Sequence, residues 1–153
     1  MDLVNIYKRV TYITFILVLS VITTSAAQNS DRKSVEQSID YYIVGWRNGD
    51  VALLEKTFDM DAGVVLWVDT GGDSEKLNSM PLSQLAAKVK PHADYGVGYH
   101  IQNLDIIDSK LAMARVKIPM PSKGSYYIDY LQLQKINGEW RIVLKSFVYF
   151  PKE

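Results

Sequence analysis

The chain has 153 residues, of which 48% are apolar and 22% are charged, a composition that suits one globular domain. Its formal net charge is zero and no basic run follows the N-terminus, so we expect no nucleic-acid partner. The absence of cysteine excludes disulfides, thiolate metal sites and a cysteine nucleophile. His92 and His100, the two histidines, are too few for an all-histidine metal site, and His92 with Asp94 is only a weak indication of a metal site. We expect no metal and no cofactor.

The first 27 residues have the pattern of a secretory signal peptide. A basic pair at residues 8–9 precedes apolar residues 13–23, and small residues follow at 25–27. Cleavage is expected after Ala27, with cleavage after Ala26 as the alternative. An uncleaved anchor is disfavoured, because the apolar core is shorter than the roughly 20 residues that span a bilayer. We therefore expect an exported chain, periplasmic or secreted, that contacts the membrane only through this peptide before cleavage.

Residues 28–33 are polar and are expected to form a flexible lead-in to a domain over residues 34–153. Ser34 and Gln37 have the spacing of a capping box, which predicts that the first helix begins there. Its expected buried stripe recurs at helical spacing: Val35, Ile39, Tyr42, Ile43 and Trp46. Gly49 is expected to end this helix.

The next three elements alternate between helix and strand. Asp50 can cap a second short helix over residues 51–57. Residues 63–68, rich in valine, predict a strand, and a polar glycine-containing loop follows. A third helix is expected to begin at residues 79–81 and to end at Pro91, because proline is tolerated in a first helical turn but not in the interior.

The rest of the chain predicts strands with short connections. Residues 99–108 and 111–119 can pair, and residues 126–136 and 139–150 flank Asn137-Gly138. Asn-Gly between alternating strands is the strongest short-range indication of a hairpin, since a type I′ turn needs positive φ at both positions. Helices followed by consecutive strands predict an α+β domain, with N-terminal helices on a strongly curved, mainly antiparallel sheet.

The Asn-Gly turn also predicts the register of the last hairpin. The expected cross-strand pairs are Lys135–Trp140, Leu133–Ile142, Leu131–Leu144 and Asp129–Ser146. Partners across a hairpin share one face of the sheet. The core face therefore becomes polar at Asp129, and a carboxylate at such a position is unusual.

Over about residues 34–150 the chain resembles the nuclear-transport-factor-2-like superfamily, and within it the bacterial group labelled "putative lumazine-binding". The resemblance rests on the order of elements, on residues 58–62 (FDMDA), and on residues 127–147 (YIDYLQLQKINGEWRIVLKSF). It implies a cystatin-like cone with a pocket at its open end, and common dimerisation through the outer sheet face. Met60 stands where many relatives have histidine, so no role of that histidine is carried over.

The resemblance does not decide the function, since the superfamily includes isomerases, cyclases, dehydratases and non-enzymatic binding domains. The lumazine label indicates no particular ligand. The sequence leaves open whether the loops at residues 69–78 and 91–98 close over the pocket.

Asp129 is the main candidate for chemistry, with Tyr127 and Ser146 as expected neighbours. Burial disfavours the charged form of a carboxyl group, which suits general acid–base catalysis. The resemblance implies an aspartate with a nearby tyrosine for steroid-isomerase-like members of the superfamily. The favoured alternative is a carboxylate that is hydrogen-bonded at the wet rim of the cone, because buried polar groups are usually just satisfied.

Other residues could line the pocket. Tyr42, Trp46 and Trp67 could hold a planar or apolar ligand, although plain core packing explains their spacing equally well. His92 and His100 could act as bases, but a lone loop histidine is more often a surface residue. The expected pocket lining is Tyr42, Trp46, Trp67, Tyr127, Asp129, Ser146 and His100.

The opposite face of the last hairpin is rich in aromatic residues. The members of this expected dimer face are Tyr126, Ile128, Tyr130, Phe147 and Tyr149, with Lys145 among its polar residues. An apolar patch of this kind in water favours burial in a homodimer with two-fold symmetry, and a site for another protein is the alternative.

Three hypotheses follow for the function. The favoured one is an exported, dimeric binding or accessory domain for a small apolar or aromatic ligand. The second is a small isomerase- or dehydratase-like enzyme that uses Asp129 as its acid–base group, with Tyr127 or Tyr42 as hydrogen-bond partner. The third is a protein-interaction module that uses the tyrosine-rich sheet.

Overall fold

The computed structural model describes residues 28–69 and 74–152. The predicted signal peptide lies outside these residues, so export stays a prediction. Within the described ranges, no helix has both the length and the apolar character needed to cross a membrane.

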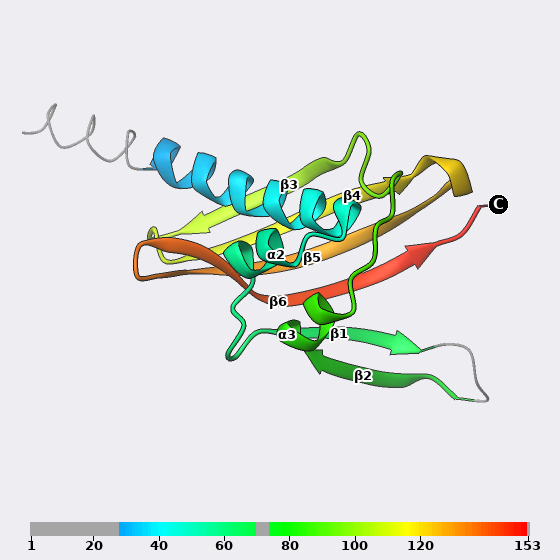
Figure 1. Cartoon of the computed structure of the whole chain (residues 1–153). Coiled ribbons are helices and arrows are strands. Elements are labelled where there is room, and N and C mark those ends of the chain that lie inside the picture. Colours follow the sequence, from blue (N-terminus) through cyan, green and yellow to red (C-terminus); the bar gives the residue numbers. More distant parts are fainter. Residues whose placement is uncertain (1–27, 70–73, 153) are drawn as a thin grey trace, which may run out of the picture.

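The long N-terminal helix covers residues 28–48 of the described chain and lies along the sheet (Figure 1). The prediction of a flexible lead-in at residues 28–33 was wrong, because these residues are already helical. Asp31 attaches this first part of the helix to the last hairpin, because its Oδ1 accepts hydrogen bonds from Lys135 Nζ at 2.7 Å and from Trp140 Nε1 at 3.2 Å. Ser34 is therefore not an N-cap, and its hydroxyl donates to the carbonyl of Ser30.

The buried stripe of this helix is confirmed. Val35, Ile39, Tyr42 and Ile43 are fully buried, and Trp46 is partly buried against the core. Helix α2, Val51–Thr57, has the predicted bounds.

The residues predicted to end the first helix and to cap α2 do so in the structure. Gly49 ends the first helix with a φ of 67°. The Asp50 carboxylate accepts the backbone N–H of Leu53, as an N-cap should.

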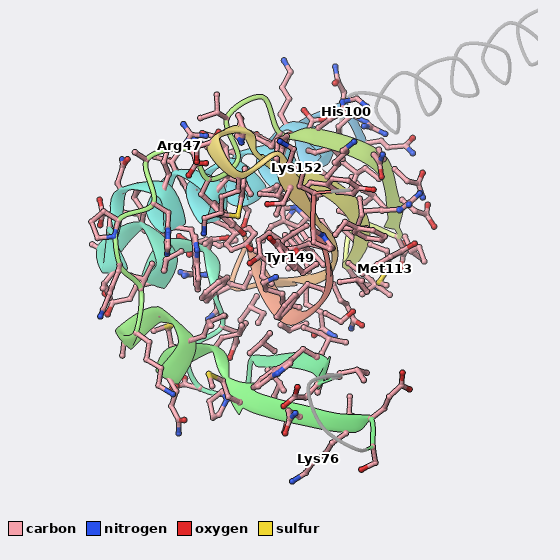
Figure 2. All side chains as sticks on the ribbon, turned by 90° about the vertical axis from the view of Figure 1, so that its right-hand side faces the viewer. Arg47, Lys76, His100, Met113, Tyr149 and Lys152 are labelled. Carbon is pink, nitrogen blue, oxygen red and sulfur yellow. The ribbon has the colours of Figure 1, made fainter. Side chains whose placement is uncertain are left out.

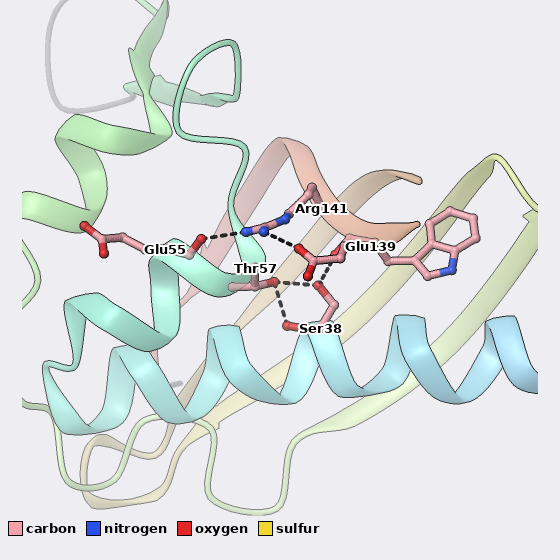
Figure 3. A network of polar contacts seen from close by, with 6 residues as sticks. Ser38, Glu55, Thr57, Glu139 and Arg141 are labelled. Atoms are coloured by element: carbon pink, nitrogen blue, oxygen red, sulfur yellow. Dashed lines mark hydrogen bonds and ion pairs between the residues drawn. The ribbon is translucent and has the colours of Figure 1, made fainter. Parts of the chain in front are cut away.

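A polar network joins the N-terminal helix, α2 and the last hairpin (Figure 3). The hydroxyls of Ser38 and Thr57 lie 2.6 Å apart, and the Ser38 hydroxyl donates to the carbonyl of Trp140. Arg141 donates to the carbonyl of Glu55 at 2.7 Å and pairs with the Glu139 carboxylate. These contacts fix both helices against the strand that follows the hairpin turn.

Six strands form one sheet in the order β2-β1-β6-β5-β4-β3. Their bounds are β1 Val64–Asp69, β2 Lys76–Pro81, β3 His100–Ile107, β4 Leu111–Met120, β5 Ser125–Ile136 and β6 Glu139–Phe150. Neighbouring strands are antiparallel except β1 and β6, which are parallel, so the sheet is mixed. The helices cover one face of this curved, unclosed sheet, which confirms the predicted α+β fold (Figure 1).

Strand β2 was not predicted. Its sequence, KLNSMP, contains no β-branched residue, and its pairing is set by the neighbouring strand β1. As a result, helix α3 begins only at Leu82 and ends at Ala87, shorter than expected.

The last hairpin has the predicted turn, with φ of 51° at Asn137 and 86° at Gly138. The pairs Lys135–Trp140 and Leu133–Ile142 are confirmed. Beyond them the predicted register was wrong, because a β-bulge on β6 leaves Val143 as an extra residue.

The bulge exchanges the two faces of β6. Leu131 lies opposite Lys145 instead of Leu144, and Asp129 lies opposite Phe147 instead of Ser146. Side chains alternate along a strand, so a one-residue shift moves Lys145 and Phe147 to the core face and Ser146 to the outer face.

The outer face of the sheet therefore differs from the expected one. Tyr126, Ile128 and Tyr130 lie opposite Phe150, Val148 and Ser146 respectively, whereas Phe147 and Tyr149 share the inner face with Tyr127. Tyr130 and Val148 are 51% and 58% exposed. Homodimerisation through this corrected outer face stays a prediction.

Candidate functional site: a buried ion pair beside an aromatic cavity

A cavity of about 190 Å³ lies between the N-terminal helix, α3, the loop at residues 91–98, and strands β5 and β6. Its lining residues are Tyr42, Trp46, Leu85, His92, Tyr95, Met120, Lys123, Tyr127, Lys145 and Phe147. His92 and Lys123 are exposed, whereas Tyr42, Tyr95 and Lys145 are buried. The cavity thus runs from an exposed rim to a buried polar floor.

Asp129 lies behind this floor and is completely buried. Its Oδ2 accepts hydrogen bonds from Lys145 Nζ at 2.6 Å and from the Tyr42 hydroxyl at 2.7 Å. Its Oδ1 has no hydrogen-bond partner among the residues that the structure describes. A buried acceptor with no partner costs free energy, so this oxygen is available to a proton or to a water molecule.

Lys145 supplies the positive charge at the floor and is 5% exposed. Burial lowers the pKa of this lysine, because the ammonium form loses its hydration, and the Asp129 carboxylate opposes that change only in part. The ammonium nitrogen lies 4.3 Å from the centroid of the Phe147 ring and 5.6 Å from that of Tyr42. Lys145 therefore gives up its proton more readily than an exposed lysine.

Two tyrosines extend this pair toward the cavity. The hydroxyls of Tyr42 and Tyr95 lie 2.6 Å apart. Because Tyr42 donates to Asp129, the Tyr95 hydroxyl is the donor to Tyr42 when the carboxylate is charged. Burial raises the pKa of both tyrosines well above the ordinary value of 10.0, so both hydroxyls stay protonated.

The loop at residues 91–98 is a fixed wall of the cavity. Arg47, labelled in Figure 2, donates from Nε to the carbonyl of Tyr95 at 2.8 Å and from Nη2 to the carbonyl of Gly96 at 2.9 Å. On the residue just before Tyr95, the Asp94 carboxylate accepts the backbone N–H and the hydroxyl of Ser122. These contacts hold the Tyr95 side chain at the floor.

Gly96→Ala is expected to loosen this wall. Gly96 has a φ of 65°, and an added Cβ would lie 2.5 Å from Cγ2 of Ile43. The strained backbone and the clash together predict a loss of about 2–4 kcal/mol of folding free energy, measured by urea denaturation.

Gly98→Ala is the matched control, because Gly98 has a similar φ of 70° and nothing within 4 Å of an added Cβ. Its expected loss is about 1–2 kcal/mol, from the backbone alone. Equal losses in Gly96→Ala and Gly98→Ala would contradict the close packing of this loop on the helix.

The structure brings together only part of the predicted pocket lining. Tyr42, Trp46 and Tyr127 line the cavity. Asp129 lies behind them, and Trp67 stacks on Phe147 at a ring-centroid distance of 6.5 Å without lining the cavity.

Two predicted lining residues lie away from the cavity. Ser146 is on the outer face of the sheet, opposite Tyr130. His100 is exposed at the start of β3 and lies at the periphery of the molecule in Figure 2.

Sequence reasoning missed Lys145, Tyr95 and Phe147. Lys145 and Phe147 were placed on the opposite face because of the unseen bulge. Two clues existed: the run Ile142-Val143-Leu144 breaks the alternation of β6, and a buried carboxylate needs a cation nearby. Tyr95 belongs to an irregular loop, for which periodicity gives no direction.

The fold described above, helices packed on one face of a curved mixed sheet, agrees with the comparisons with known proteins. Residues 30–148 match the family described as "Putative lumazine-binding". The chain belongs to this family.

Solved structures show the same fold. An NTF2-like protein of unknown function from Shewanella baltica OS155 covers 80% of this chain and 96% of its own, with a TM-score of 0.68 and 21% identity. A cystatin-like fold protein from Burkholderia xenovorans LB400 covers 82% of this chain and 96% of its own, with a TM-score of 0.63 and 10% identity. These likenesses show that the chain has the fold of NTF2-like and cystatin-like proteins.

One curated relative has a named activity. "Aldolase FrzH" of Cladobotryum sp is 24% identical over 115 residues, which cover 72% of this chain and 85% of that protein. The match spans most of both chains.

Proposed function

We propose that the domain binds a small ligand in the aromatic cavity, with an apolar ring as its body and a carbonyl or carboxylate oxygen directed to Lys145. The observation that carries this proposal is a buried ammonium group at the end of an otherwise aromatic cavity. Ligand sites typically combine apolar walls with a few polar groups that fix orientation.

The size of the cavity limits the ligand. An apolar cavity of about 150 Å³ accommodates benzene. A volume of about 190 Å³ therefore admits one substituted ring. The aromatic walls formed by Trp46, Tyr127 and Phe147 favour a planar group over a branched one.

The charge of the cavity indicates the polar end of the ligand. Lys145 at the floor and Lys123 at the rim are cationic, and the described lining contains no aspartate or glutamate. Asp129 lies behind Lys145 and already accepts two hydrogen bonds on Oδ2. A ligand oxygen that accepts hydrogen bonds fits this floor, whereas a ligand cation does not.

Binding of benzaldehyde, benzoate and toluene is measured by two-dimensional NMR of the chain from residue 28 onward. The oxygen-bearing ligands are expected to shift the signals of Trp46 and Tyr127 in a saturable way, and more strongly than toluene does. Leu85→Trp fills the cavity and should abolish these shifts. Met113→Trp, on the 38% exposed Met113 of β4, is the matched control and should leave them unchanged.

Failure of all three ligands to give saturable shifts in the unmodified chain would refute the proposal. Equal shifts in Leu85→Trp and Met113→Trp would also refute it, because the ligand would then bind elsewhere.

An enzymatic function is the second candidate, and two observations favour it. The pair of Asp129 and Lys145, with two tyrosines attached, is a set of groups that can exchange protons. The name of the curated relative, an aldolase, is consistent with carbonyl chemistry at the Lys145 end of the cavity. Asp129 would act through Lys145 or through Tyr42 and Tyr95, since it does not line the cavity itself.

A further inference from the structure

We propose that Lys145 is an imine-forming amine: its Nζ condenses with the carbonyl carbon of an aldehyde or ketone held in the aromatic cavity. This inference rests on the proposed ligand site and deepens it by naming the reactive group and the substrate class. It is carried by the position of Lys145, which lines the cavity while its Nζ lies 2.6 Å from a fully buried carboxylate.

A lysine reacts with a carbonyl only as the neutral amine. Burial lowers the pKa of Lys145, and the rings of Tyr42 and Phe147 beside Nζ keep the amine in apolar surroundings. Desolvation in an apolar pocket is one of the ways in which proteins activate lysine nucleophiles. Lys123, which lines the same cavity, is exposed and has no such surroundings.

The proton balance uses the carboxylate behind the lysine. The Lys145 ammonium transfers one proton to Asp129, and the neutral nitrogen attacks the carbonyl carbon. A C–N bond forms while the carbonyl π electrons move to oxygen, which takes up the proton held by Asp129, so that the carbinolamine nitrogen carries two protons and the positive charge. One of these two protons then passes by way of Asp129 to the hydroxyl, which leaves as water, and the iminium ion that remains carries the positive charge of the former ammonium. The net reaction is ammonium plus carbonyl gives iminium plus water.

The surrounding groups suit these proton transfers. Asp129 Oδ1 has no hydrogen-bond partner among the described residues and can hold the proton that leaves Lys145. Tyr95 lines the cavity, and its hydroxyl is linked through Tyr42 to the same carboxylate. When Asp129 is protonated, the direction of these two hydrogen bonds can reverse and relay the proton to the carbonyl oxygen. The iminium ion formed would remain paired with Asp129, which avoids an isolated buried charge.

The test is reductive trapping of the folded chain with benzaldehyde and cyanoborohydride at pH 7, followed by peptide mass spectrometry. A benzyl group is expected on Lys145, formed faster than on Lys123, because burial lowers the pKa of Lys145 and the cavity holds the aldehyde beside it. In urea the two lysines should react alike. Leu85→Trp should remove the labelling of Lys145 and leave that of Lys123.

The outcomes separate this inference from the ligand site on which it rests. If benzaldehyde gives saturable NMR shifts at Trp46 but Lys145 is not trapped preferentially, the imine is refuted and the binding site stands. If benzaldehyde neither binds nor labels Lys145, both proposals fall. Lys145→Arg keeps the charge and cannot form an imine, so preferential labelling of any other lysine at the same rate in this variant would also refute the assignment.

Discussion

Replacing Asp129 with alanine is expected to lower the free energy of unfolding by about 3–5 kcal/mol, which is the usual cost of removing one partner from a buried ion pair. The carboxylate is fully buried and is the hydrogen-bond partner of both Lys145 and Tyr42. Its removal leaves a buried ammonium and a buried hydroxyl without their acceptor. A domain of this kind has about 5–15 kcal/mol of stability in total. Urea denaturation followed by tryptophan fluorescence measures the loss.

Two further variants show whether the loss comes from the unpaired charge. The double variant Asp129→Leu with Lys145→Met replaces the pair by apolar groups and should recover most of the stability. Asp108→Asn removes the charge of the exposed pair with Lys110, whose side chains are 78% and 79% exposed, and suits the φ of 50° at this position, so it should change little. A loss in Asp129→Ala no larger than that in Asp108→Asn would contradict the assigned role of the buried pair.

Above pH 10 the domain is expected to lose stability steeply. Burial raises the pKa of Tyr42 and Tyr95 well above 10.0, and it raises the pKa of Tyr99 to about 12. These tyrosines stay protonated in the folded chain but ionise near pH 10 in the unfolded chain. The folded state then binds more protons, so raising the pH favours unfolding. Tyr42 and Tyr95 each contribute at most about 1.4 kcal/mol per pH unit.

Lys145 acts in the opposite sense and at lower pH. Its pKa is lowered in the folded chain, so the unfolded chain binds more protons between that pKa and 10.5, and stability rises with pH in this window. This contribution ends near pH 10.5, where the unfolded lysine also loses its proton. The fall at higher pH therefore reports the tyrosines.

The measurement combines urea denaturation between pH 7 and 12 with the absorbance of tyrosinate. Tyr42→Phe should lower stability at pH 7, because the hydrogen bonds to Asp129 and Tyr95 are lost, yet it should make the fall above pH 10 shallower. Tyr130→Phe, at a 51% exposed position, is the control and should leave the slope unchanged. Complete tyrosinate formation near pH 10 in a chain that stays folded would refute the buried state of these hydroxyls.

Local signals in the sequence were sufficient for most of the fold. Asp50 fixed the start of α2, Asn137-Gly138 fixed the last turn, and the helical stripe fixed the buried face of the first helix. In each case a single residue or a single sequence period determines the structural feature through a direct physical cause. The strand at residues 76–81 was not predicted, because its conformation is set by pairing with β1 rather than by its own side chains.

The candidate site was harder to predict, because its parts meet through tertiary structure. Asp129 could be recognised as an acidic residue on the core face of a strand. Its partner Lys145 could not, since the periodicity of β6 changes at Val143. Tyr95 reaches the floor only because Arg47 and Asp94 hold an irregular loop against the helix and η1, Pro121–Lys123.

The bulge at Val143 has a consequence for how such a domain can diversify. A one-residue insertion after Val143 that keeps the bulge would exchange the inward and outward residues of the second half of β6 and leave the hairpin turn in place, whereas deletion of Val143 itself would remove the bulge and keep Lys145 opposite Leu131. After such an insertion Leu144, Ser146 and Val148 would take the inward positions in place of Lys145 and Phe147. The same insertion would turn Lys145 outward and leave Asp129 buried without its cation, so the register of β6 and the residue at position 129 can change only together.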